Sequence, residues 1–196
     1  DGARTATVAT LGVLLADHKD NFLTNAHTDD YVVRNLADNL IKMFNIFVQK
    51  PKFAALVAGG GDQLTAYLKD VALPRLRTAA TKTGVPLANR NHYLRVLRAF
   101  VQLGDSIAPS ATPPLFDVPS GSIAAMATDH RHDAVHRGLA FDLLAALPDR
   151  AAVAATLAAK ATDMLAFEQL WAHFGGLDSD DIVDVVVKRL QASQQR

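Results

Sequence analysis

The sequence predicts an all-α protein. Apolar residues recur at helical spacing along nearly the whole chain. Alternating β-branched runs bounded by hairpin turns, which are typical of strands, are not found in the sequence. Hydrophobic residues make up 49% of the chain, a share that supports a globular core. We therefore expect about nine or ten helices in a single domain over residues 1–196.

The clearest helix is predicted over residues 30–49. Its apolar stripe is Val32, Leu36, Leu40, Met43, Phe44 and Phe47, and its polar face is Arg34, Asp38, Lys42, Asn45 and Gln49. Lys50-Pro51 ends it, because a residue before proline avoids the helical region.

Further helices follow from the same spacing. A short helix over 51–57 ends at Gly59-Gly60-Gly61, and a longer one over 62–81 is expected to kink at Pro74. The other predicted helices cover 89–103, 120–127, 129–147, 149–161, 163–174 and 179–191. The stretch 104–121, rich in proline and serine, is predicted to be irregular.

The amino-acid composition limits the electrostatic partners and the cellular compartment that we expect for the protein. Lys plus Arg equals Asp plus Glu at 20 each, so no global field draws the chain to nucleic acid or to an anionic membrane. The absence of cysteine fits a reducing compartment, and we expect a cytoplasmic protein. The apolar stretches are too short to span a membrane. The chain begins Asp1-Gly2-Ala3 without methionine, which suggests a fragment of a larger protein.

Two segments of the chain resemble each other. Val32-Val33-Arg34-Asn35-Leu36-Ala37-Asp38-Asn39-Leu40-Ile41 matches Val135-His136-Arg137-Gly138-Leu139-Ala140-Phe141-Asp142-Leu143-Leu144 at half of its positions. A second helix follows each copy at a proline. Similar units at a distance are typical of stacked helical repeats, whereas an ordinary helical bundle is the alternative.

In this arrangement the chain resembles armadillo repeats, and more broadly armadillo- and HEAT-like helical repeats. Leu40-Ile41-Lys42-Met43-Phe44-Asn45-Ile46 resembles the end of a third repeat helix, and Phe53-Ala54-Ala55-Leu56-Val57-Ala58-Gly59-Gly60 resembles the next first helix and its glycine turn. The resemblance implies an armadillo-like right-handed helical stack. It also implies that Asn45 lies in a groove that binds a partner's backbone. The second copy has Leu147-Pro148 in place of this asparagine, and Ile41 replaces the usual tryptophan.

The sharpest local cluster is Asp129-His130-Arg131-His132-Asp133-Ala134-Val135-His136. His132 and His136 have the spacing of a metal-binding pair, so a metal-dependent helical-bundle enzyme is one alternative. The preferred interpretation is a solvated first turn, with Asp129 as the helix cap and Asp133 favouring the helix dipole. We expect no enzyme activity, metal or cofactor. Trp171, Phe44, Phe47 and Phe174 lie on apolar stripes and are predicted to be core.

One charged segment stands out. Between Asp70 and Asp105 there are several cations and no carboxylate. The candidate partner-binding residues are Arg75, Arg77, Lys82, Arg90, Tyr93, Arg95 and Arg98, together with Asn45. Helical spacing places Arg95, Arg98 and Gln102 on one face, and Leu94, Leu97 and Val101 on another.

These residues predict a non-enzymatic protein–protein interaction module or scaffold. Its basic helical face would bind an acidic protein segment, because arginine makes bidentate contacts to carboxylates. An RNA- or DNA-binding helical domain that uses the same arginines is the alternative, and a solvated surface is the simplest interpretation. The oligomeric state does not follow from the sequence.

Overall fold

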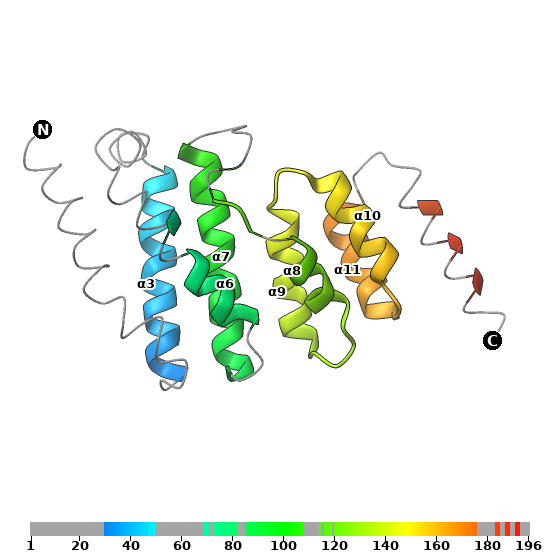
Figure 1. Ribbon diagram of the computed structural model, residues 1–196, viewed down its shortest axis with the longest axis horizontal. Helices are drawn as coiled ribbons and strands as arrows, with labels where there is room; N and C mark the ends of the chain where they lie inside the picture. Colours follow the sequence, from blue (N-terminus) through cyan, green and yellow to red (C-terminus); the bar gives the residue numbers. More distant parts are fainter. Residues whose placement is uncertain are drawn as a thin grey trace, which may run out of the picture. The chain divides into compact units, whose positions relative to one another are not determined.

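The computed structural model describes residues 30–49, 69–70, 73–81, 85–107, 114, 116–118, 120–175, 183–184, 187–188 and 191–192. Regular structure in these ranges is helical throughout, without strands, so the predicted all-α class is confirmed. The helices are α3 (Asp30–Gln49), α6 (Leu73–Thr81), α7 (Leu87–Ile107), α8 (Ser120–Thr128), α9 (Ala134–Ala145), α10 (Arg150–Lys160) and α11 (Met164–Phe174) (Figure 1).

Some predicted helices lie wholly or partly outside the described residues. These are the helix over 51–57 with its glycine turn, the part of the next helix over 62–68, and most of the one over 179–191. Residues 183–184, 187–188 and 191–192 of the last are helical. The total of nine or ten helices therefore stays a prediction.

Three predicted boundaries need correction. Helix α6 begins at Leu73, so Pro74 lies in its first turn, where a missing N–H costs little. Residues 69–70 before it are also helical; 71–72 lie outside the described residues, so the kink at Pro74 stays a prediction. Helix α7 continues through Gly104 to Ile107. Helix α9 begins at Ala134, after the turn over 129–133.

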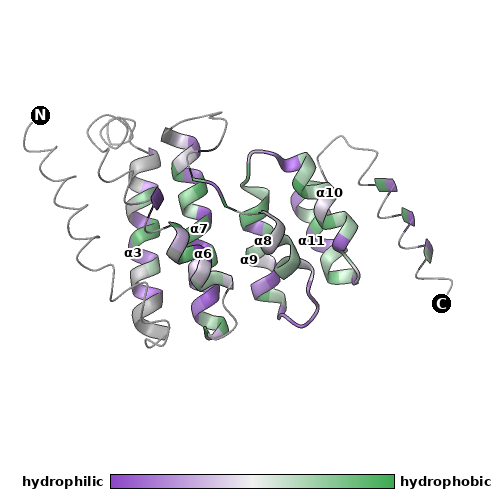
Figure 2. Cartoon of the chain, in the orientation of Figure 1, coloured by the Kyte–Doolittle hydropathy of each residue, from purple (hydrophilic) through white to green (hydrophobic). Residues whose placement is uncertain are grey.

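The chain divides by its internal contacts into two compact units, Asp1–Val118 and Pro119–Arg196. Such a division does not decide whether the units are independent domains, so the single domain over 1–196 stays a prediction. Within each described helix, hydrophobic and hydrophilic residues interleave, most clearly along α7 (Figure 2).

In the first unit, α3 and α6 both pack against α7. Phe100 of α7 contacts Phe44 of α3 edge to face, with ring centroids 4.8 Å apart. It contacts Phe116, beyond the end of α7, in the same manner at 5.3 Å. All three rings are buried, and edge-to-face pairs add to the stabilisation from apolar burial. The predicted core role of Phe44 is therefore confirmed.

Helices α3 and α7 run in the same direction. Asp38 of α3 forms an ion pair with Arg95 of α7, and further along both helices Phe44 meets Phe100. Because the contacts occur in the same order on both helices, the two are parallel. Helix α6, which lies between them in the chain, packs against α7.

In the second unit, α8 packs against α9 and α10, and α11 packs against the same two helices. Short connections make consecutive helices antiparallel; Arg150 at the start of α10 donates to the carbonyl of His173 at the end of α11, at 2.7 Å. Helices α9 and α11 are parallel, because Arg137 meets Asp163 near their starts and Asp142 lies 3.7 Å from His173 further along. The hairpins α8/α9 and α10/α11 thus stack on each other, with helices two apart in the chain as neighbours.

Candidate interaction surface on α3 and α7

The packing of α3 and α7 leaves a polar strip on each helix. The described members on α3 are Arg34, Asp38, Lys42, Asn45 and Gln49, and those on α7 are Asn91, Arg95, Arg98, Gln102 and Asp105; each is exposed or half-buried. Their opposite sides hold Ala37, Phe44, Leu94, Leu97 and Val101 in the core. We call these two strips the α3/α7 polar face. The predicted separation of polar and apolar residues on both helices is confirmed at these positions.

An ion pair joins the two strips. The Nη2 atom of Arg95 lies 2.9 Å from Oδ1 of Asp38, and 39% and 36% of the two side chains are exposed. Arg95 also lies 3.5 Å from Nδ1 of His92. Because a partly exposed pair contributes little stability, its main effect is to set the position of Arg95 on the surface.

The parallel register brings further polar side chains together. Lys42 follows Asp38 by one helical turn, and Arg98 follows Arg95 by nearly one turn, so the register places Lys42 and Arg98 at the same level of the face. Both are exposed. Asn45 and Gln102, one turn further, are also exposed and provide amide donors and acceptors.

The other predicted binding residues are not gathered on this face. Arg77 donates to the backbone carbonyl of Asp117 at 3.4 Å, and Arg90 is half-buried. Arg75 lies in α6, but its side chain is outside the described residues, as is the whole of Lys82. Of the residues predicted from the sequence, the structure therefore brings together Asn45, Arg95 and Arg98.

Tyr93, which the sequence places among the partner-binding residues, is not on the α3/α7 polar face. Its side chain is fully buried in the first unit. Burial raises the pKa of its phenol, because the interior disfavours the phenolate. Tyr93 therefore belongs to the core that supports the polar face. The sequence placed it among the arginines by proximity, although the spacing to Leu97 and Phe100 also fits the buried side of the helix.

Sequence reasoning did not include Asp38 and Lys42 among the binding residues. The signal was present in their helical spacing with Asn45, which puts all three on one side of the helix. What the sequence did not show was the partner of Arg95. Asp38 lies outside the carboxylate-free segment in the sequence and meets it only through the packing of α3 on α7.

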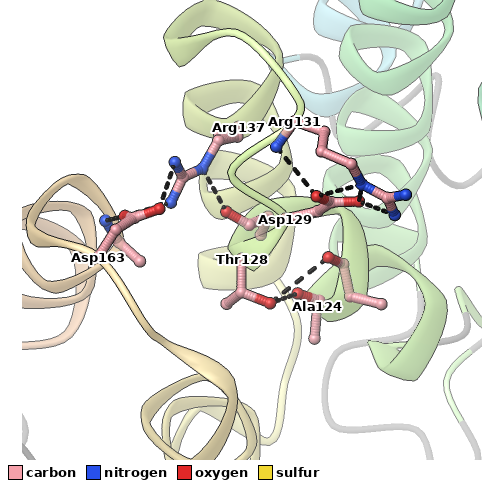
Figure 3. A network of polar contacts seen from close by, with 9 residues as sticks. Ala124, Thr128, Asp129, Arg131, Arg137 and Asp163 are labelled. Atoms are coloured by element: carbon pink, nitrogen blue, oxygen red, sulfur yellow. Dashed lines mark hydrogen bonds and ion pairs between the residues drawn. The ribbon is translucent and has the colours of Figure 1, made fainter. Parts of the chain in front are cut away.

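The side chains of the histidine cluster and its neighbours form helix caps and hydrogen bonds within the second unit. Asp133, not Asp129, caps α9: its Oδ1 accepts from the backbone N–H of His136 at 2.8 Å. Asp129 instead receives the guanidinium of Arg131, at 2.7 Å between Nη2 and Oδ2 (Figure 3). The connection over 129–133 is hydrophilic (Figure 2), and its residues are exposed or half-buried, as the predicted solvated turn requires. His136 and Arg137, which follow in α9, are buried.

Arg137 of α9 forms hydrogen bonds with α8 and with the cap of α11; we call these contacts the Arg137 network. Its guanidinium donates to both carboxylate oxygens of Asp163, at 2.9 and 2.7 Å, and to the backbone carbonyl of Ala127, at 3.0 Å (Figure 3). Asp163 in turn caps α11 by accepting from the backbone N–H of Ala166, at 2.8 Å. The hydrogen bonds from Arg137 hold the pKa of Asp163 below its ordinary value.

The rings of His132 and His136 lie 4.8 Å apart. In the part of the chain that the structure describes, no group of three or more histidine and acidic side chains could hold a metal ion. In the same part of the chain, no helix has the length and apolar character needed to span a membrane. Comparison of the chain with protein-family models, with curated proteins and with solved structures finds no match.

Proposed function

We propose that the protein is a non-enzymatic interaction module whose α3/α7 polar face binds an acidic segment of a protein partner. The observation that carries the proposal is the alignment of Lys42 and Arg98, both exposed, beside an Arg95 that Asp38 holds in place. The face as a whole has four cations, Arg34, Lys42, Arg95 and Arg98, against two carboxylates, Asp38 and Asp105. Such a surplus favours carboxylate ligands.

The scaffold that we propose is an armadillo-like stack of helical repeats. The parallel packing of α3 on α7, with helix α6 between them in the chain, supports it, because equivalent helices of successive repeats are parallel neighbours in such stacks. The stacked hairpins α8/α9 and α10/α11 support it independently, since adjacent helices of a simple up-and-down bundle are antiparallel.

The echo between residues 32–41 and 135–144 gives partial support to the repeat. Ala37 and Ala140, which correspond in the two copies, are both fully buried. Arg34 and Arg137 also correspond, but Arg34 is exposed and Arg137 is 3% exposed. We therefore place the binding role in the first copy, where the polar strip faces outward.

A binding titration with a labelled Glu-rich peptide tests the proposal. We expect the wild-type protein to bind this peptide. The double variant Lys42→Glu/Arg98→Glu should bind it with an affinity at least about tenfold lower, because both reversed charges repel the ligand. Arg95 is left unchanged, because a carboxylate there would face Asp38 and disturb the packing of α3 on α7.

Two controls separate this face from general charge effects. Arg131→Glu reverses an exposed charge in the second unit and should leave binding unchanged. A peptide with Gln in place of Glu should not bind. Equal binding by the wild-type protein and the double variant would refute the proposal. Preferred binding of a single-stranded oligonucleotide, with a steep loss of affinity at higher salt, would instead favour a nucleic-acid partner.

A further inference from the structure

Helix α11 has an apolar stripe that its packing in the second unit leaves uncovered. Met164 and Trp171 are 61% and 64% exposed, and Phe167 between them is half-buried. The three residues recur at helical spacing and lie beside the buried row of Ala166, Leu170 and Phe174. The predicted core position of Trp171 is therefore wrong for the described structure, whereas that of Phe174 is confirmed.

A second uncovered apolar stripe lies nearby in the sequence. Val183 and Val187, one helical turn apart, are 47% and 43% exposed. The ion pair between Asp184 and Lys188, at 3.5 Å, has the spacing of the same helix and lies on its polar side. The sequence continues this stripe with Val186 and Leu190.

We propose that residues 179–191 form a helix that packs antiparallel on α11 and covers Met164 and Trp171. A connection of about four residues after Phe174 is within the usual length for antiparallel helix pairs. That connection aligns Trp171 with Val183, Phe167 with Val187 and Met164 with Leu190. Each residue of the α11 apolar stripe thus meets an apolar residue of the C-terminal segment, and burial of both stripes is favourable.

Charges along the two helices are complementary in this orientation. The acidic start of the segment, which includes Asp180, Asp181 and Asp184, lies toward the end of α11 that carries His173 and is bonded to Arg150. Lys188 lies within about one helical turn of the exposed Glu168. A parallel orientation would place the aspartates toward Asp163 instead, at the start of α11.

The fluorescence of Trp171 tests this proposal, because Trp171 is the single tryptophan of the chain. In the full chain we expect emission typical of a covered indole and weak quenching by acrylamide. Val183→Ser/Val187→Ser should shift the emission to longer wavelength and increase quenching severalfold. Gln191→Ser/Ala192→Ser changes exposed residues of the same segment and should leave both signals as in the wild type.

Three results would overturn the proposal. The first is free quenching of Trp171 in the wild-type protein, and the second is quenching that the valine substitutions do not change. The third is protection that rises with protein concentration together with a dimer in light scattering, which would assign the cover to a second copy of the chain. Circular dichroism should show that the second unit stays folded in each variant.

Discussion

At the scale of single residues, Arg137 illustrates how a buried charge is accommodated. Its side chain is 3% exposed, and the carboxylate that it binds is 30% exposed. Arg137→Met keeps most of the side-chain volume but removes the guanidinium that donates to Asp163 and to the carbonyl of Ala127, so that Asp163 keeps only the N–H of Ala166 among its described donors. We expect a loss of about 2 to 3 kcal/mol in the free energy of unfolding, below the range for fully buried pairs because Asp163 retains solvent. Urea unfolding measures it.

Arg131→Met is the matched control for Arg137→Met. Arg131 also forms a bidentate contact with an aspartate, but its side chain is 80% exposed. Exposed pairs are screened by water, so the unfolding midpoint should not change measurably. Equal losses of unfolding free energy in the two variants would contradict the conclusion that the Arg137 network stabilises the second unit.

The same pair predicts a dependence of stability on pH. Arg137 lowers the pKa of Asp163 from an unfolded value near 3.8. A depressed pKa in the folded state contributes stability that is fully present above the unfolded pKa and is lost as pH falls through the folded one. Urea midpoints of the wild-type protein should therefore decline below about pH 4, and Arg137→Met should show a shallower decline. Parallel declines would show that other carboxylates dominate.

Helix α7 contains Gly104, although glycine in a helix interior is usually destabilising; the close approach of Phe116 explains why a larger residue does not fit there. A Cβ atom at this position would lie 2.9 Å from the Phe116 ring, which is itself packed on Phe100. Gly104→Ala should reduce stability by about 1 kcal/mol, because overpacking outweighs the gain in helix propensity. At Gly138 the nearest atom is 3.9 Å away, so Gly138→Ala should increase stability by about 0.5 to 1 kcal/mol. Thermal unfolding should show these opposite signs.

At the scale of helices, local chemistry decides where α9 begins. Asp133→Ala removes the acceptor for the N–H of His136 and should reduce stability by about 1 kcal/mol. Asp133→Ser retains a capping oxygen and should recover most of that loss in thermal unfolding. If the serine variant is as unstable as the alanine variant, the side chain of Asp133 does not act as the cap.

The positions of the described helices could largely be predicted because they depend on local spacing. The bounds of α3 follow from its apolar stripe and Pro51, and Asp149 and Asp163 begin the predicted helices that they cap. Asp129 failed as a predicted cap because two aspartates in one short stretch satisfy the same local rule. Only the turn over 129–132 distinguishes them.

At the scale of the whole molecule, pairing between distant residues limited the prediction of the site. The α3/α7 polar face depends on Asp38 meeting Arg95, which requires the register of two parallel helices. Trp171 has the spacing of a core residue, but its burial depends on which segment packs there. Helical periodicity identifies the apolar side of a helix and does not identify its neighbour.

The second unit has the contacts of a self-sufficient core. Its fully buried residues come from all four of its described helices and include Ile123, Phe141, Leu157 and Phe174. The Arg137 network and the helix caps at Asp133, Asp149 and Asp163 also lie within the second unit. We therefore expect residues 119–196 to fold when expressed without 1–118, although so short a chain has a small stability margin.

Circular dichroism and urea unfolding of the 119–196 fragment test this expectation. A helical signal with one cooperative transition would show that the fragment folds. Loss of that transition in Arg137→Met would show that the Arg137 network stabilises the isolated unit. The dependence on Arg137 matters, because helical signal alone can arise from separate helices without a core. An unfolded fragment, or one insensitive to Arg137→Met, would mean that the core of the second unit requires contacts from residues 1–118.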